Sequence, residues 1–124
     1  MLKLICYVFI GSGVGGVLRY MAATVLPHPA VNLPAPWPTL LVNITGCFII
    51  GLIYGGGTHI TGMSPALRTG LTAGFCGGLT TFSTFSYETL TMLTQGHLWQ
   101  AIFYTVASVV LGIGAAWLGY LSVR

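Results

Sequence analysis

Charged residues are so sparse in this chain that its fold must suit a membrane rather than water. Lys, Arg, Asp and Glu make up 4% of the 124 residues, against about 25% in an ordinary soluble domain. No residue between Tyr20 and Leu67 carries a permanent charge. A helix needs roughly 20 apolar residues to cross a bilayer, so the chain accommodates about four crossings. We therefore expect an all-α integral membrane protein, with residues 1–124 forming a single four-helix transmembrane domain.

The expected helices are separated by residues that interrupt helical structure. Prolines accumulate from Pro27 to Pro38, and proline lacks the amide donor that a helix interior requires. Trp37, Tyr54 and Trp99 lie at expected helix ends, where aromatic rings suit the lipid headgroup region. The predicted helices cover residues 4–26, 37–54, 65–95 and 99–121. Four crossings place both termini on one side of the membrane.

The few cations indicate an orientation. Lys3, Arg68 and Arg124 fall on the side of the termini, whereas the opposite loops contain no Lys or Arg. The positive-inside rule therefore favours cytoplasmic termini. Three charges make only a modest bias, and insertion in both orientations stays open.

The third predicted helix differs from a lipid-facing helix. It contains the run GLTAGFCGGLTTFSTFSYE, which places glycines and hydroxyls at the depth of the membrane centre. Gly77 and Gly78, followed by Thr80 and Thr81, weaken the helix, so we expect a break near its middle. Freed backbone groups at this depth line ion sites in transporters. Close helix packing is the alternative explanation for the glycines.

Phe82 and Phe85 are three residues apart and share one helix face. An aromatic ring has a positive edge that favours an anion, and Ser83 and Thr84 add hydroxyl donors. A small, hard anion would find both kinds of contact here. Plain packing is the alternative for the pair of phenylalanines.

Polar residues also follow stripes on two other predicted helices. One stripe lies on helix 37–54 and comprises Thr39, Asn43, Gly46 and Ile50; another lies on helix 99–121 and comprises Tyr104, Ser108 and Gly112. These stripes could line a narrow polar track. Hydrogen bonds between helices are the alternative role for Asn43, Tyr104 and Ser108.

Arg19 and Glu88 are expected at a similar depth, near the ends of the first and third helices. One hypothesis is that Arg19 attracts anions into a vestibule, which Glu88 partly neutralises. An ion pair that fixes helix packing is the alternative.

Several function classes fit the residues poorly. The run from Gly11 to Gly16 matches G-x-G-x-x-G, but the chain has no Asp for a nucleotide ribose. Its repeated small residues, Gly11 with Gly15 and Ser12 with Gly16, instead suit close helix packing. Four scattered cations make no nucleic-acid patch, and no nucleophile–base pair or metal cluster indicates an enzyme. The three cysteines form no C-x-x-C pair and are expected to be inert thiols.

Other membrane functions are alternatives. A proton-coupled small-ion exporter would need a titratable relay, but Glu88 is the sole acid and His28, His59 and His97 fall in predicted loops. A haem-binding anchor would need histidines within helices. A structural membrane subunit stays possible, although it would leave the hydroxyl cluster of the third helix unexplained.

The segments GSGVGGVLRY, LLVNITGCFIIG and GFCGGLTTFSTFSYE resemble the signatures of the Fluc (CrcB) fluoride channels, in the same order. The resemblance covers nearly the whole chain. It implies a fluoride-selective passive channel that exports fluoride from the cytoplasm, in the inner membrane of a bacterium. It also implies an antiparallel homodimer of dual topology, with pores built from both subunits.

By the same resemblance, the residues acquire specific roles. Phe82 and Phe85 would meet fluoride with their ring edges, with Asn43 as an amide donor and Arg19 as the arginine of the first helix. Ser83, Thr84, Tyr104 and Ser108 are further candidates for the fluoride pore. A structural sodium ion is implied at the dimer centre, held by backbone carbonyls of Gly77 and Thr80. Sodium is a hard cation that prefers such oxygen ligands.

Overall fold

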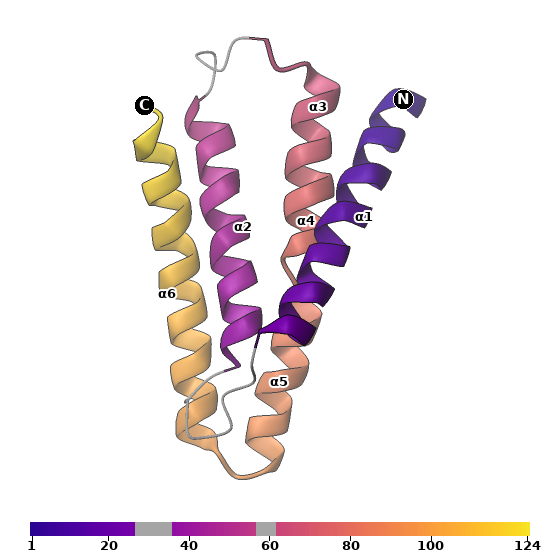
Figure 1. Ribbon diagram of the computed structural model, residues 1–124. Helices are drawn as coiled ribbons and strands as arrows, with labels where there is room; N and C mark the ends of the chain where they lie inside the picture. Colours follow the sequence, from indigo (N-terminus) through magenta and orange to yellow (C-terminus); the bar gives the residue numbers. More distant parts are fainter. Residues whose placement is uncertain (27–35, 57–61) are drawn as a thin grey trace.

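The computed structural model describes residues 1–26, 36–56 and 62–124, and all regular structure in these ranges is helical. Three helices are long: α1 (Leu2–Val25), α2 (Trp37–Gly56) and α6 (Leu98–Ser122). Each of them is long and apolar enough to cross a membrane. In Figure 1, α2 and α6 lie side by side, and α1 leans against the remaining helical segment. The prediction of an all-α, multi-pass membrane protein is confirmed.

The remaining helical segment corresponds to the predicted third transmembrane helix; we call it the composite crossing, and it is made of four pieces. It comprises α3 (Pro65–Thr69), the π-helix η1 (Gly70–Cys76), α4 (Gly77–Leu79) and α5 (Phe82–Thr94). Between α4 and α5, Thr80 and Thr81 have extended backbone, with ψ angles of 155° and 120°. Gly77 and Gly78, where we expected helical structure to fail, are themselves helical. The interruption follows them at the two threonines, and Figure 1 shows the chain leaving the helix there.

Small residues allow α1 to approach the composite crossing closely. A Cβ atom added to Gly15 would collide with the carbonyl oxygen of Phe75 in η1. A Cβ atom at Gly78 of α4 would lie 2.5 Å from the Ser12 carbonyl oxygen and 3.1 Å from the Gly16 N. The predicted packing role is confirmed for Gly11 and Gly15, where backbone meets backbone with no room for a side chain, whereas a Cβ atom at Gly16 would meet nothing within 4 Å.

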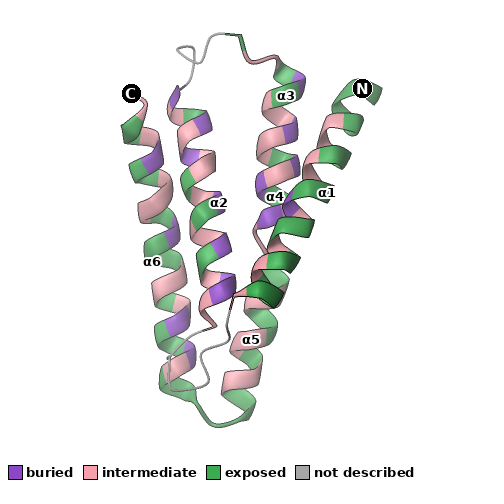
Figure 2. Ribbon diagram, in the orientation of Figure 1, coloured by how far each residue is buried: buried purple, intermediate pink, exposed green. Residues whose placement is uncertain are grey.

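Much of the apolar surface of the chain faces outward. Figure 2 shows exposed residues along the outer sides of α1 and α6. Phe9 on α1 and Trp99 on α6 are 79% and 80% exposed, and few hydrophobic side chains of the described residues are buried. Such a surface is stable only when lipid or another protein covers it.

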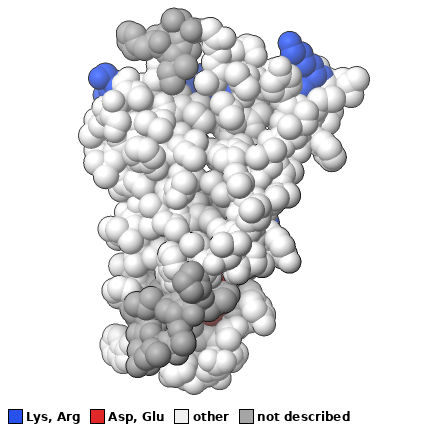
Figure 3. Space-filling view, viewed as in Figure 1, with Lys and Arg blue, Asp and Glu red and all other residues white. Residues whose placement is uncertain are grey.

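Three of the four cations, Lys3, Arg68 and Arg124, lie at one end of the molecule, whereas Arg19 lies beside Gly78. Figure 3 shows Lys and Arg atoms at the end that holds both termini. Arg68 lies 4.8 Å from the ring centroid of Tyr54, and Arg124 lies 5.2 Å from that of Tyr120. His97 precedes α6 as its N-cap residue. His28 and His59 lie outside the described residues.

Candidate functional site: an aromatic cavity at the interrupted crossing

The first turn of α5 begins with a side-chain cap and carries the two phenylalanines. Thr81 is the N-cap residue, and its hydroxyl accepts a hydrogen bond from the Thr84 N–H at 3.2 Å. This cap starts a new helix directly after the extended residues. Phe82 and Phe85 follow in the first turn, with ring centroids 5.7 Å apart and ring planes at 37°. The two rings therefore lie on one face, as their spacing predicts.

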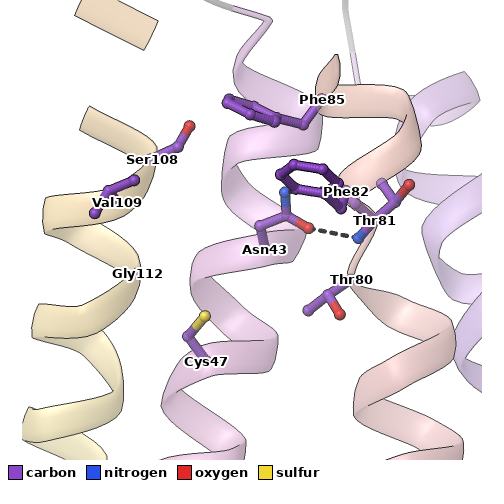
Figure 4. Close-up of a pocket in the computed structure, with 9 residues that line it drawn as sticks. All are labelled: Asn43, Cys47, Thr80, Thr81, Phe82, Phe85, Ser108, Val109 and Gly112. Carbon is purple, nitrogen blue, oxygen red and sulfur yellow. Dashed lines mark hydrogen bonds between the residues drawn. The ribbon is translucent and has the colours of Figure 1, made fainter. Parts of the chain in front are cut away.

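Asn43 of α2 binds the interrupted backbone directly. Its side-chain oxygen accepts the Thr81 N–H at 2.8 Å, and its Nδ2 donates to the Thr81 carbonyl at 3.2 Å. Figure 4 shows the side chain reaching from α2 to the extended residues. Lipid offers no partner for these backbone groups, so the amide satisfies both of them. An Asn side chain has two N–H donors, and the second has no acceptor among the described residues.

A cavity of about 300 Å³ lies between α2, α5 and α6, beside the interrupted backbone. We call it the aromatic cavity; it is lined by Asn43, Cys47, Thr80, Thr81, Phe82, Phe85, Ser108, Val109 and Gly112. Figure 4 shows these residues converging from the three elements. The Ser108 hydroxyl is buried and has no hydrogen-bond partner among the described residues. A buried hydroxyl without a partner is costly, which makes Ser108 available to a ligand.

Tyr104 does not line the aromatic cavity but supports it from behind. Its side chain is completely buried, and its hydroxyl donates to Glu88 Oε2 at 2.8 Å. Thr39 donates to the other carboxylate oxygen, so Glu88 joins α2, α5 and α6. The Tyr104 ring lies 5.0 Å from the Phe85 ring, measured between centroids. Tyr104 therefore packs against Phe85, and its hydroxyl proton is already used in the hydrogen bond to Glu88.

Arg19 does not pair with Glu88. The structure has no ion pair between them; instead Arg19 Nε donates to the Gly78 carbonyl at 3.1 Å. Arg19 also lines a smaller cavity of about 150 Å³ on the α1 side of α2. We call it the arginine cavity; its lining includes Thr39, Thr81 and Thr84. The hypothesis of a packing ion pair is wrong, whereas the vestibule stays a prediction.

The predicted pore residues thus fall into different places. Four of them share the aromatic cavity: Asn43, Phe82, Phe85 and Ser108. Thr84 lines the arginine cavity, and Ser83 is exposed, with its hydroxyl 3.3 Å from that of Thr81. Sequence reasoning passed over Cys47 as a lining residue. Its position four residues after Asn43 was the available signal.

The backbone around the interruption fits the predicted cation site. In a continuous helix, the Thr81 N–H would bond to the Gly77 carbonyl, but here it donates to Asn43. The Thr84 N–H would likewise bond to Thr80, but it donates to the Thr81 hydroxyl. Both carbonyls therefore lack their helical donors. Carbonyl oxygens released in this way suit a hard monovalent cation.

Comparisons with known proteins show the family of this chain. Residues 6–120 match the protein family described as CrcB-like protein, Camphor Resistance (CrcB). A relative from Geobacter sulfurreducens, named fluoride-specific ion channel FluC, is 44% identical over 113 residues, which cover 91% of this chain and 90% of the relative. Relatives of the same name from Flavobacterium psychrophilum and Pyrococcus horikoshii are 39% and 40% identical. The matched regions span 97% and 98% of this chain, and 96% and 97% of the two relatives. The chain belongs to the CrcB family.

Proposed function

We propose that this protein is a passive, fluoride-selective ion channel. The relatives that match it over nearly their whole length are named fluoride-specific ion channels, which supports this assignment. The observation that carries the proposal is the aromatic cavity, where hydrogen-bonding side chains and two phenylalanine rings line one space beside an interrupted helix. A channel performs no chemical conversion, so the protein is not expected to be an enzyme.

Selectivity follows from the chemistry of the donors. Fluoride is small and strongly hydrated, so a pore must replace its water with donors along a narrow path. Among the described residues, the Ser108 hydroxyl has no hydrogen-bond partner, and one N–H of Asn43 has no acceptor. The edges of the Phe82 and Phe85 rings add partial positive charge without a fixed cation. An anion is thereby held weakly enough to leave, which rapid conduction requires.

The open side of the aromatic cavity supports assembly with a second copy. Phe82 is 79% exposed although it lines the cavity, so one subunit does not enclose an anion there. We infer an antiparallel homodimer of dual topology, in which the partner covers this face and completes the pore. The weak charge bias of Lys3, Arg68 and Arg124 would permit insertion in both orientations.

A structural sodium ion at the dimer centre belongs to the same proposal. The residues that would hold it are Gly77 and Thr80, through their backbone carbonyls. When bound, the ion would neutralise carbonyl dipoles and tie two interrupted crossings together. Asn43 and the Thr81 cap keep those two carbonyls free of helical hydrogen bonds, because they bind the N–H groups that would otherwise donate to them.

The direction of flow follows from the membrane potential. Hydrogen fluoride is a weak acid that crosses lipid in its neutral form and ionises in a near-neutral cytoplasm. In the inner membrane of a bacterium, a negative interior would drive fluoride outward through a passive pore. The channel would thus lower the toxicity of fluoride.

A flux experiment separates this proposal from a proton-coupled exporter. Purified protein in liposomes would be given either a membrane potential without a pH gradient or a pH gradient at zero potential. A passive channel moves fluoride to its electrochemical equilibrium with the potential alone and moves no protons with it. Accumulation of fluoride beyond equilibrium under the pH gradient, faster than the accumulation by neutral hydrogen fluoride in protein-free liposomes, would instead establish coupling. The single acid, Glu88, is already bonded to Thr39 and Tyr104, which argues against a proton relay.

A further inference from the structure

Arg19 reaches from α1 to the end of α4, one residue before helical structure stops. Its Nε donates to the Gly78 carbonyl at 3.1 Å, and α4 ends at Leu79. The last carbonyls of a helix have no intrahelical donor. In the middle of a membrane, lipid cannot supply one. Arg19 therefore satisfies a carbonyl that the interruption leaves without a helical partner.

The interruption is held from a second side by α2. Asn43 bonds to both backbone groups of Thr81, three residues after Gly78. Two side chains from two different helices therefore fix the two ends of the extended segment. Thr80 and Phe82 of the aromatic cavity lie within this segment or directly after it.

The packing around Gly78 places Arg19 at this carbonyl. A Cβ atom on Gly78 would lie 2.5 Å from the Ser12 carbonyl oxygen and 3.1 Å from the Gly16 N. Arg19 follows Gly16 by three residues and so lies about one turn further along the same face of α1. The backbone of α1 packs against α4 at Gly78, and the guanidinium of Arg19 adds a hydrogen bond at the same residue.

We propose that Arg19 is a positioning residue of the channel, whose guanidinium fixes the path of the backbone from Gly78 to Thr81. The inference rests on the proposed function and goes beyond attraction of anions by a positive charge. The Nε donor holds the carbonyl, which leaves the terminal nitrogens available to the arginine cavity. Charge alone would act at any nearby position, whereas this role requires the hydrogen bond.

Hydrogen exchange measured by mass spectrometry tests the role directly. The full-length protein would be reconstituted as wild type, Arg19→Gln and Arg19→Lys, with Arg68→Gln as the matched control. Arg68 contacts the Tyr54 ring at the terminal end and does not line the aromatic cavity. Arg19→Gln should speed exchange of the amides of residues 80–82 by about tenfold or more, as expected for a lost hydrogen bond to a charged group. Arg19→Lys should give an intermediate increase, and Arg68→Gln none.

Fluoride efflux from the same liposomes separates positioning from attraction. A positioning role predicts that Arg19→Gln lowers efflux by a factor that does not change when potassium gluconate raises the ionic strength. An attracting charge is screened by salt, so its loss would matter less at high ionic strength. Wild-type exchange at residues 80–82 in Arg19→Gln, with a salt-dependent loss of efflux, would overturn the proposal.

Two further outcomes have a defined meaning. Should Arg19→Gln fail to assemble, Arg19→Lys decides alone: exchange equal to wild type would contradict a role for the guanidinium, and faster exchange would support it. Should the wild type conduct no fluoride, the proposed function would fall. The exchange comparison would still measure whether Arg19 holds the interruption.

Discussion

Asn43 and Ser108 differ in how the fold uses their polar atoms. The Asn43 side chain uses its oxygen and one N–H in hydrogen bonds with the backbone of Thr81, so Asn43 has a structural role. The buried hydroxyl of Ser108 makes no hydrogen bond within the described residues. Both line the aromatic cavity. Substitution of Asn43 would therefore confuse folding with conduction, whereas Ser108 permits a cleaner experiment.

Ser108→Ala should reduce fluoride efflux by about tenfold, which corresponds to one lost hydrogen bond to an anion. The thermal stability of the folded protein should be unchanged or slightly higher, because an unsatisfied hydroxyl leaves a buried site. Ser122→Ala is the matched control, since Ser122 lies on the same helix with its hydroxyl bonded to the Leu118 carbonyl. Efflux measured in liposomes decides. Full activity of Ser108→Ala would remove this hydroxyl from the ion path.

The composite crossing shows which parts of an element can be predicted from local sequence. The helical, apolar character of the chain follows from its composition, and the long helices begin and end within a few residues of prolines, glycines and aromatic residues. The exact interruption does not follow. Gly77 and Gly78 have low helix propensity, yet they remain helical where Gly78 packs on α1. Thr81 is extended because Asn43, 38 residues away, binds its backbone.

The same limit applies to the site. The spacing of Phe82 and Phe85 is a local property, so their shared face could be predicted. Tyr104 and Ser108 share a face of α6 as well, but contacts with another helix separate their roles. The Tyr104 hydroxyl donates to Glu88, while the Ser108 hydroxyl has no partner in the described part of the chain. A single sequence contains no direct signal for such pairings between helices.

Two glycines of α1 provide a matched test of helix packing. A Cβ atom at Gly15 would collide with the Phe75 carbonyl, whereas at Gly13 nothing lies within 4 Å. Gly15→Ala should therefore lower thermal stability and the yield of folded protein, because α1 must move away from η1. Gly13→Ala should be neutral or stabilising by about 1 kcal/mol, since alanine favours a helix over glycine. Thermal unfolding of the purified variants measures both. Equal stability of the two variants would contradict the close contact.

Across the whole molecule, apolar side chains that one chain leaves uncovered indicate where lipid, or the second subunit of the proposed dimer, would lie. The aromatic cavity is open on one side, with Phe82 mostly exposed. Lys3, Arg68 and Arg124 lie at the terminal end, and Glu88 is half-buried, with hydrogen-bond partners on α2 and α6. A homodimer would enclose the cavity and convert a half-lined site into a path.

Removal of sodium should weaken that dimer. When N-methylglucamine replaces sodium at constant ionic strength, we expect a lower dissociation temperature of the dimer and slower fluoride efflux. The carbonyls of Gly77 and Thr80 would then lose the cation that balances them. Size-exclusion chromatography during heating, with efflux measured in parallel, checks both effects. Identical behaviour in the two salts would count against a structural sodium ion.

The most direct measurement for the central claim is potential-driven efflux from liposomes, read with a fluoride electrode, with chloride and Phe82→Ile measured beside it. We predict fast efflux of fluoride, none of chloride, and loss of fluoride efflux in Phe82→Ile, which retains an apolar side chain but lacks the positive ring edge. The variant should still fold, because Phe82 is 79% exposed in the single chain. Efflux no faster than from protein-free liposomes, with the wild type folded and dimeric, would contradict the account and favour a structural membrane subunit.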